Sequence, residues 1–209
     1  MRIAKEGYPL ILTALALTVV AFAVGWKFAA AIFAFFTLAL AGFFRDPERQ
    51  IPTDEDLVVA PADGRVVSIA EVKHDAVFAG TATRLSIFLS PLDVHINRAP
   101  VAGKVETVSY HPGKFLAAYK EEASRCNEQN MLKIIDPRGR PFGVVQIAGF
   151  LARRIVCRVK SGATLARGER FGLIMFGSRT DLYLPSGCRL EVAEGQRVKG
   201  GATILGRFV

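Results

Sequence analysis

The chain has 209 residues, enough for one domain with an appendage or for two small domains. Hydrophobic residues make up 51% of it and the formal net charge is +8, a balance compatible with contact to nucleic acid or to an anionic membrane surface. No basic run with interleaved aromatic residues occurs, which argues against nucleic-acid binding. The cysteines Cys126, Cys157 and Cys188 are far apart and lack ligand spacing, so neither a disulfide framework nor a metal site is indicated.

Two apolar runs, residues 9–25 and 28–44, occupy the N-terminal region. Each is at the short end for a membrane-spanning helix, which needs about 20 residues. The intervening Gly25-Trp26-Lys27 is typical of a turn with an interfacial tryptophan. The pattern predicts a membrane-associated helical hairpin, with a single long tilted helix or a buried hairpin of a soluble protein as alternatives. A secretory signal peptide is disfavoured, because the apolar stretch is too long and no clean cleavage site precedes the second run.

Basic residues flank both ends of this region, with Arg2 and Lys5 before it and Arg45 and Arg49 after it. For a hairpin, the positive-inside rule then places both flanks in the cytoplasm. We therefore expect a cell-membrane protein whose remaining domain lies on the cytoplasmic face. A charged, proline-containing segment ends the apolar region and predicts a membrane-associating segment 1–45 followed by a domain at 46–209.

The second domain is predicted to be mainly β. Short β-branched segments bounded by turn residues predict strands at residues 65–72, 84–89, 143–149, 154–159 and 189–192. Many short strands at close spacing favour a compact β-sandwich or barrel. A helix is predicted from Lys114 to about Glu128, where Phe115, Leu116, Tyr119 and Ala123 share a face.

Two glycine-containing loops, residues 162–170 and 195–206, resemble each other loosely. Similar paired loops occur in lipoyl-like β-sandwiches. Ordinary hairpin punctuation is the alternative explanation, since glycine turns recur in all-β chains.

Polar side chains gather in three short segments: residues 60–64, 88–100 and 110–115. The first holds Asp63 in a Pro/Gly turn, where an aspartate most often serves as a turn former. The second places an acid, His95, an amide and a guanidinium between two prolines, a polar load that a plain strand would not carry. The third contains His111, a second candidate acid that also fits a turn, whereas His74 is typical of a solvated turn.

Gly177-Ser178 is the single Gly-Ser pair in the chain and follows an apolar run. A serine hydroxyl in a tight turn can attack the preceding carbonyl carbon and form an ester. β-Elimination and hydrolysis then leave a pyruvoyl group, whose ketone can form a Schiff base with an amine and act as an electron sink. Taken alone, the pair also fits a simple hairpin turn.

The ordered set PADG, FLSPLDVHINRAP, HPGKF and an apolar strand ending in Gly-Ser resembles the phosphatidylserine decarboxylase proenzymes, closest to their short, membrane-associated prokaryotic form. The resemblance runs from about Phe44 to the C-terminus. It implies self-cleavage between Gly177 and Ser178 into a β chain, residues 1–177, and an α chain, residues 178–209. It also implies a pyruvoyl cofactor made from Ser178, and membrane phosphatidylserine as the substrate that is converted to phosphatidylethanolamine in phospholipid biosynthesis.

The resemblance assigns roles residue by residue. Ser178 is the cleaved serine, His95 protonates the decarboxylated intermediate, and Asp63 assists processing. Longer members have a second histidine where this chain has Arg98, and threonine where it has Arg179. The residue that activates Ser178 therefore stays open: either His95 serves both steps, or maturation relies on backbone strain and Asp63.

Arg98 and Arg179 are candidates for the lipid phosphate, because a guanidinium contacts phosphate oxygens in a bidentate manner; surface charges are the alternative.

A different class of function is a membrane-anchored adaptor or carrier with a lipoyl-like domain and no catalysis. Neither the heptad-patterned helical hairpin of such adaptors nor a lipoyl-acceptor lysine turn is present. The sequence leaves open homo-oligomerisation and the choice between ester and ether lipids.

Overall fold

The computed structural model describes residues 2–73, 80–118, 122–150, 154–175 and 177–208. The chain divides into two compact units, Met1–Glu48 and Arg49–Val209. The division falls inside the charged segment that ends the apolar region.

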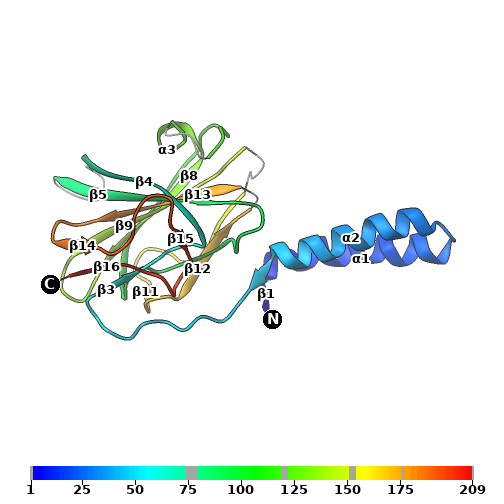
Figure 1. The fold of residues 1–209 in the computed structure, drawn as a ribbon, viewed down its shortest axis with the longest axis horizontal. Helices are drawn as coiled ribbons and strands as arrows, with labels where there is room; N and C mark the ends of the chain where they lie inside the picture. Colours follow the sequence, from blue (N-terminus) through cyan, green and yellow to red (C-terminus); the bar gives the residue numbers. More distant parts are fainter. Residues whose placement is uncertain (1, 74–79, 119–121, 151–153, 176, 209) are drawn as a thin grey trace. The chain divides into compact units, whose positions relative to one another are not determined.

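The first unit is a helical hairpin (Figure 1). A short strand β1 (Arg2–Ile3) and a 3₁₀ turn (Lys5–Gly7) precede α1 (Tyr8–Ala23), and α2 (Lys27–Phe43) leads into β2 (Arg45–Asp46), which pairs with β1. The chain reverses at Gly25, whose φ of 82° suits a residue without a Cβ. The prediction of a hairpin is thus confirmed over that of one long helix.

Large apolar side chains point outward from both helices of this unit. Phe22, Phe28 and Leu38 are 71%, 82% and 73% exposed, an apolar surface that water does not favour. Within the described residues, the segment Lys5–Ala23 is long and apolar enough to cross a membrane, and α2 is shorter.

The second unit is a β-sandwich, which confirms the predicted fold class. Its main layer is an antiparallel sheet in the order β11-β7-β8-β9-β13-β5-β4-β15. The strand bounds are β4 (Gly64–Lys73), β5 (Thr81–Leu89), β7 (Gly103–His111), β8 (Gln129–Ile135), β9 (Pro141–Ile147), β11 (Thr164–Leu165), β13 (Ser178–Leu184) and β15 (Arg197–Val198).

Two three-stranded sheets complete the sandwich, in the orders β10-β12-β6 and β14-β16-β3. Their bounds are β3 (Leu57–Val59), β6 (Ile96–Arg98), β10 (Ile155–Cys157), β12 (Arg170–Ile174), β14 (Cys188–Leu190) and β16 (Ile204–Phe208). One apolar core joins the strands of all three sheets, with Leu85, Ile87, Leu132, Phe142 and Phe171 fully buried in it. Full burial of each such side chain contributes about 1.5–3 kcal/mol.

Two parts of the second unit are similar in sequence and each leads into a long strand. Residues 60–66 read APADGRV and residues 99–105 read APVAGKV. The glycine in each begins a long strand, β4 or β7, and a Cβ on it would lie 2.2 or 2.4 Å from a backbone oxygen of the neighbouring strand. Asp63 of the first segment corresponds to Ala102 of the second. An acid is therefore present in only one of the two.

The two loops that resemble each other in sequence occupy equivalent positions. Residues 162–170 contain β11, which pairs with β7, and residues 195–206 contain β15, which pairs with β4. They therefore supply the two opposite edges of the main sheet.

The helix predicted from Lys114 to Glu128 is wrong, because among the described residues of this segment only α3 (Ala123–Cys126) is helical. The Asn127 side chain explains the difference. Its Nδ2 donates to the carbonyls of Leu116 (2.8 Å) and Ala148 (2.7 Å), and its Oδ1 accepts the Leu116 N–H (2.9 Å). These bonds hold the segment as a loop against β9, where a helix would need the same backbone groups for itself. Tyr119 and His74 lie outside the described residues.

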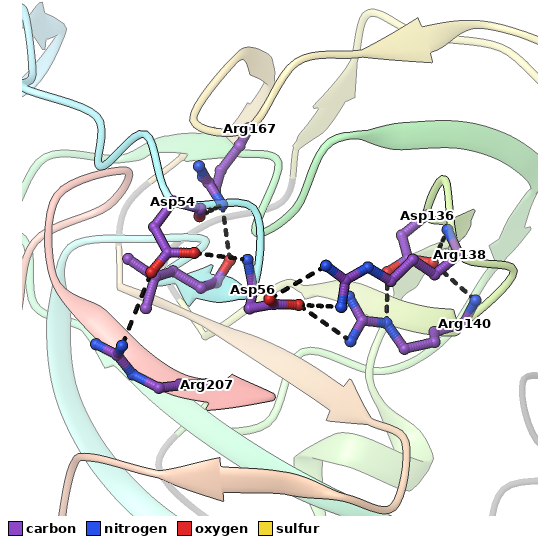
Figure 2. Close-up of polar contacts among 8 residues, drawn as sticks. Asp54, Asp56, Asp136, Arg138, Arg140, Arg167 and Arg207 are labelled. Carbon is purple, nitrogen blue, oxygen red and sulfur yellow. Dashed lines mark hydrogen bonds and ion pairs between the residues drawn. The ribbon is translucent and has the colours of Figure 1, made fainter. Parts of the chain in front are cut away.

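An ionic cluster fixes the chain segment that leads into β3. Figure 2 shows Arg138 and Arg140 converging on Asp56, while Arg140 also binds Asp136 at 2.6 Å. Arg167 donates to the backbone carbonyls of residues 52 and 57 at 2.7 Å and 3.1 Å. Part of the basic excess of the chain is therefore used to hold the fold together.

Candidate active site

One end of the main sheet collects the predicted site residues. Ser178 begins β13 opposite Leu89, the last residue of β5. Because β13 is antiparallel to both β5 and β9, its first residue lies where those two strands end. Asp63 directly precedes β4, whose first residues pair with the end of β5, and His95 lies in the loop from β5 to β6. The fold thus brings Asp63, His95 and Ser178 to the same end.

Ser178 is completely buried, and its Oγ has no hydrogen-bond partner among the described residues. Leaving a buried hydroxyl unpaired costs about 1–3 kcal/mol, so such an atom is a candidate for a chemical role. The preceding Gly177 has a φ of 61°, a left-handed conformation that residues with a Cβ rarely adopt. The bond between them therefore joins a left-handed glycine to a buried hydroxyl that lacks a hydrogen-bond partner among the described residues.

Gly149 lies directly against the carbonyl of Gly177. A Cβ on Gly149 would lie 1.8 Å from that carbonyl oxygen and 3.3 Å from the side chain of Ala118. The carbonyl that Ser178 would attack is thus packed against a backbone position without a side chain. Sequence reasoning saw residue 149 only as the end of a strand and missed this contact.

His95 is 2% exposed and tied to the strand that leads to Gly177. Its Nδ1 lies 2.9 Å from the Asp93 carbonyl oxygen, which can only accept, so Nδ1 carries a hydrogen and Nε2 is the nitrogen that can exchange a proton. The backbone N–H of Ile174, in β12, donates to the His95 carbonyl at 3.3 Å. The Asp93 carboxylate accepts both the N–H and the hydroxyl of Ser90, which fixes the loop that carries the imidazole.

Asp63 is held by Arg49 and by the backbone of the loop before β16. Its Oδ2 accepts from Arg49 at 2.7 Å and its Oδ1 accepts the Gly200 N–H at 2.8 Å. Burial raises the pKa of Asp63 above its ordinary 3.8, and this effect outweighs the opposing Arg49 charge. Among the described residues, the carboxylate makes no hydrogen bond to His95 or Ser178. Arg49, known from sequence only as a membrane flank, is its actual partner.

The geometry contradicts the prediction that Arg179 binds the lipid phosphate. Its guanidinium is 2% exposed and binds the Asp181 carboxylate at 2.6 Å and Ser86 Oγ at 2.7 Å. Arg98 is likewise buried, and its Nη1 donates to the Gly168 carbonyl at 3.0 Å. Neither side chain is presented to a ligand from solvent. His111, the second candidate acid, lies exposed at the end of β7.

A buried amide chain links the strand after His95 to the strand that begins with Ser178. Asn97 donates to Thr180 Oγ1 at 3.0 Å, Gln146 donates to Asn97 Oδ1 at 2.9 Å, and Asn130 donates to Gln146 Oε1 at 3.0 Å. Asn97 and Thr180 each follow a site residue by two positions, and Thr180 shares a face of β13 with Ser178. These hydrogen-bonded side chains join β6 to the main sheet and fix the spacing between β6 and β13.

A surface cavity of about 660 Å³ lies at the opposite end of the main sheet, lined by Lys104, Asp136 and Leu165 among others. The pairing of Lys104 with Ile135 places it where β7 begins and β8 ends. No predicted site residue lines this cavity.

Comparison with known proteins matches residues 36–206 to the family model for phosphatidylserine decarboxylase. Relatives named phosphatidylserine decarboxylase proenzyme occur in Magnetococcus marinus, with 46% identity over 99% of this chain and 95% of the relative, and in Symbiobacterium thermophilum, with 47% identity over the same shares. A third, from Gluconacetobacter diazotrophicus, is 53% identical over 79% of this chain and 75% of its own length. The chain therefore belongs to the phosphatidylserine decarboxylase family of enzymes.

Proposed function

We propose that this protein is a proenzyme that cuts itself between Gly177 and Ser178 and then decarboxylates phosphatidylserine to phosphatidylethanolamine with a pyruvoyl group. The observation that carries the proposal is the fully buried Ser178 Oγ, unpaired among the described residues, beside a left-handed glycine. Membership of the family supports the substrate.

The cut follows from the chemistry of the two residues. Ser178 Oγ adds to the Gly177 carbonyl carbon, the C–N bond breaks, and an ester with a free amine on residue 178 results. Loss of the Ser178 α-proton then expels the Gly177 carboxylate and leaves dehydroalanine. Water converts this to the ketone and releases ammonia. We assign acceptance of the hydroxyl proton to Nε2 of His95, which lies in the adjoining loop, and assistance in processing to Asp63 through the turn that it fixes with Arg49.

The space at residue 178 suits the product of this reaction. A pyruvoyl residue keeps Cα and Cβ, carries an oxygen in place of the backbone nitrogen and lacks Oγ, so it needs no more room than the serine. When formed, the group supplies an electron sink for the bond that releases carbon dioxide. His95, buried beside the end of β12, then returns a proton to the substrate Cα.

The helical hairpin gives the enzyme access to a lipid substrate. Its outward apolar side chains would lie in the cell membrane, with the β unit on the cytoplasmic face. Deletion of residues 1–45 should then release the protein from membranes. Recovery of the full-length chain entirely in the soluble fraction would contradict the anchor.

The intact mass of the purified full-length protein tests the cut. We expect two fragments that meet between residues 177 and 178, the smaller with a blocked N-terminus, and carbon dioxide release from carboxyl-labelled phosphatidylserine. Ser178→Ala should stay uncut and inactive, whereas Ser186→Ala, a change at an exposed turn serine, should behave as wild type. A single uncut wild-type chain without decarboxylase activity would refute the proposal.

A second variant separates the two chemical steps. His95→Ala should lose decarboxylation, because the proton donor to the substrate Cα is gone. Its cleavage state tells whether the same imidazole also serves maturation. An uncut His95→Ala chain assigns maturation to His95, whereas a cut chain without decarboxylase activity assigns the later proton transfer to His95 and leaves maturation to backbone strain and Asp63. Normal turnover by the variant would remove His95 from the mechanism.

A further inference from the structure

In the part of the β unit that the structure describes, the large exposed apolar side chains lie at one end of the main sheet. Among the described residues after Glu48, the large apolar side chains that are well exposed are Leu92, Tyr110 and Phe150, at 85%, 57% and 67%. The other large exposed apolar side chains of the described residues belong to the helical hairpin. A folded domain has no internal reason to gather such residues at one end.

All three lie at the end of the main sheet that holds Ser178. Tyr110 is the second-last residue of β7, Phe150 follows the end of β9 by three positions, and Leu92 follows the end of β5 by three positions. Strand pairing aligns these ends, because His111 pairs with Gln129, Gln129 with Ile147, and Ile147 with Arg179. β7 and β5 are four strand spacings apart, which is about 19 Å along the sheet, and the end of β9 lies between them.

Basic side chains accompany them. Lys114 and Arg154 are exposed. The Arg154 carbonyl accepts the Met175 N–H at 3.2 Å, which places this residue beside the segment that leads to Gly177. Lys114 follows the end of β7, three positions after His111. Apolar and basic groups at one end complement a surface whose interior is hydrocarbon and whose head groups are anionic.

We propose that Leu92, Tyr110 and Phe150 form a lipid-binding rim that enters the bilayer surface around the active site, with Lys114 and Arg154 on the head groups. This contact is separate from the hairpin and rests on the proposed function. The acyl chains of the substrate then stay in the bilayer while its head group reaches residue 178. A tyrosine suits the polar boundary of a bilayer, and leucine and phenylalanine suit the acyl region.

The first test compares bilayer and soluble substrate with the full-length enzyme. Phe150→Asp is assayed on long-chain phosphatidylserine in phosphatidylcholine vesicles and on a short-chain phosphatidylserine below its micelle concentration. We expect the ratio of kcat/KM on vesicles to kcat/KM on the soluble lipid to fall at least tenfold. Ser186→Asp, which adds the same charge at the other end of β13, should keep the wild-type ratio.

An unchanged ratio for Phe150→Asp would overturn the rim. The proposed function fails by a different result, namely a wild-type enzyme that decarboxylates neither substrate.

The second test measures the contact directly. Trp26 is the single tryptophan, so Trp26→Phe gives a silent background into which Phe150→Trp is introduced. Vesicles containing brominated phosphatidylcholine should quench this fluorescence strongly, and should leave a Ser186→Trp protein in the same background unquenched. Equal quenching at both positions would refute the rim. A concentration-dependent blue shift of the Phe150→Trp protein without vesicles would also refute it, and would assign the surface to a second copy of the chain.

Discussion

Gly149→Ala tests the packing of the bond that is proposed to be cut. The new Cβ would stand 1.8 Å from the Gly177 oxygen, whereas ordinary contacts begin at 3.4 Å, so the carbonyl must move by about 1.5 Å or more. A misplacement of about 1 Å can lower a rate by about 100-fold when geometry controls the reaction. We therefore expect self-cleavage to slow at least about 100-fold, with an overpacking cost of about 1–3 kcal/mol in stability.

The assay follows cleavage of freshly translated protein over time on a denaturing gel, together with thermal unfolding of the purified chain. Gly80→Ala is the matched control, since a Cβ there meets nothing within 4 Å and its φ is not in the left-handed region. Wild-type cleavage kinetics in a folded Gly149→Ala protein would show that the position of the Gly177 carbonyl does not limit the reaction.

Three further predictions concern buried charges and thiols. Burial raises the pKa of Cys188 to about 11 from 9.0, so at pH 8 it should react with a maleimide about 100-fold more slowly than an ordinary thiol, while the exposed Cys126 reacts first; equal rates would contradict this. Arg179→Met leaves Asp181 buried without its partner and should lower the free energy of unfolding by about 3–5 kcal/mol, measured by denaturant titration in an uncleavable background. Burial raises the pKa of Asp63, so the folded protein binds the Asp63 proton more tightly than the unfolded chain does. The resulting contribution to stability is complete below pH 3.8 and is lost as pH rises through the raised pKa. The free energy of unfolding of the parent relative to Asp63→Asn should therefore fall from pH 4 to pH 7, and a rise would refute the assignment.

The hydrophobic pattern was sufficient to predict the hairpin and the strands around Leu85 and Val144, because burial on one face or both leaves a local signal. The segment after Lys114 has helical spacing, yet Asn127 holds it as a loop through bonds to residues far along the chain. Such a tertiary contact leaves no periodicity to detect.

The site divides in the same way. Short motifs marked Ser178, His95 and Asp63, which the fold brings to one end of the sheet. Arg179 was a candidate for the lipid phosphate because a guanidinium binds phosphate oxygens, whereas its ion pair with Asp181 becomes visible only in the fold. The role of Gly149 depends on one close approach between the end of β9 and the turn before β13, and this contact between residues far apart in the sequence leaves no local pattern.

The pairing of β13 on both sides affects the stability of the two fragments after the cut. The flanking strands β5 and β9 belong to the larger fragment, residues 1–177. β13 itself belongs to the smaller fragment, together with β14, β15 and β16. The fragments of the mature enzyme would thus be interleaved through the centre of one sheet and stay together without a peptide bond. Once denatured, however, two separate chains would have to find a register that a single chain reached by folding. Unfolding of the mature enzyme is then expected to be irreversible, and the lifetime of its activity is set by the unfolding rate.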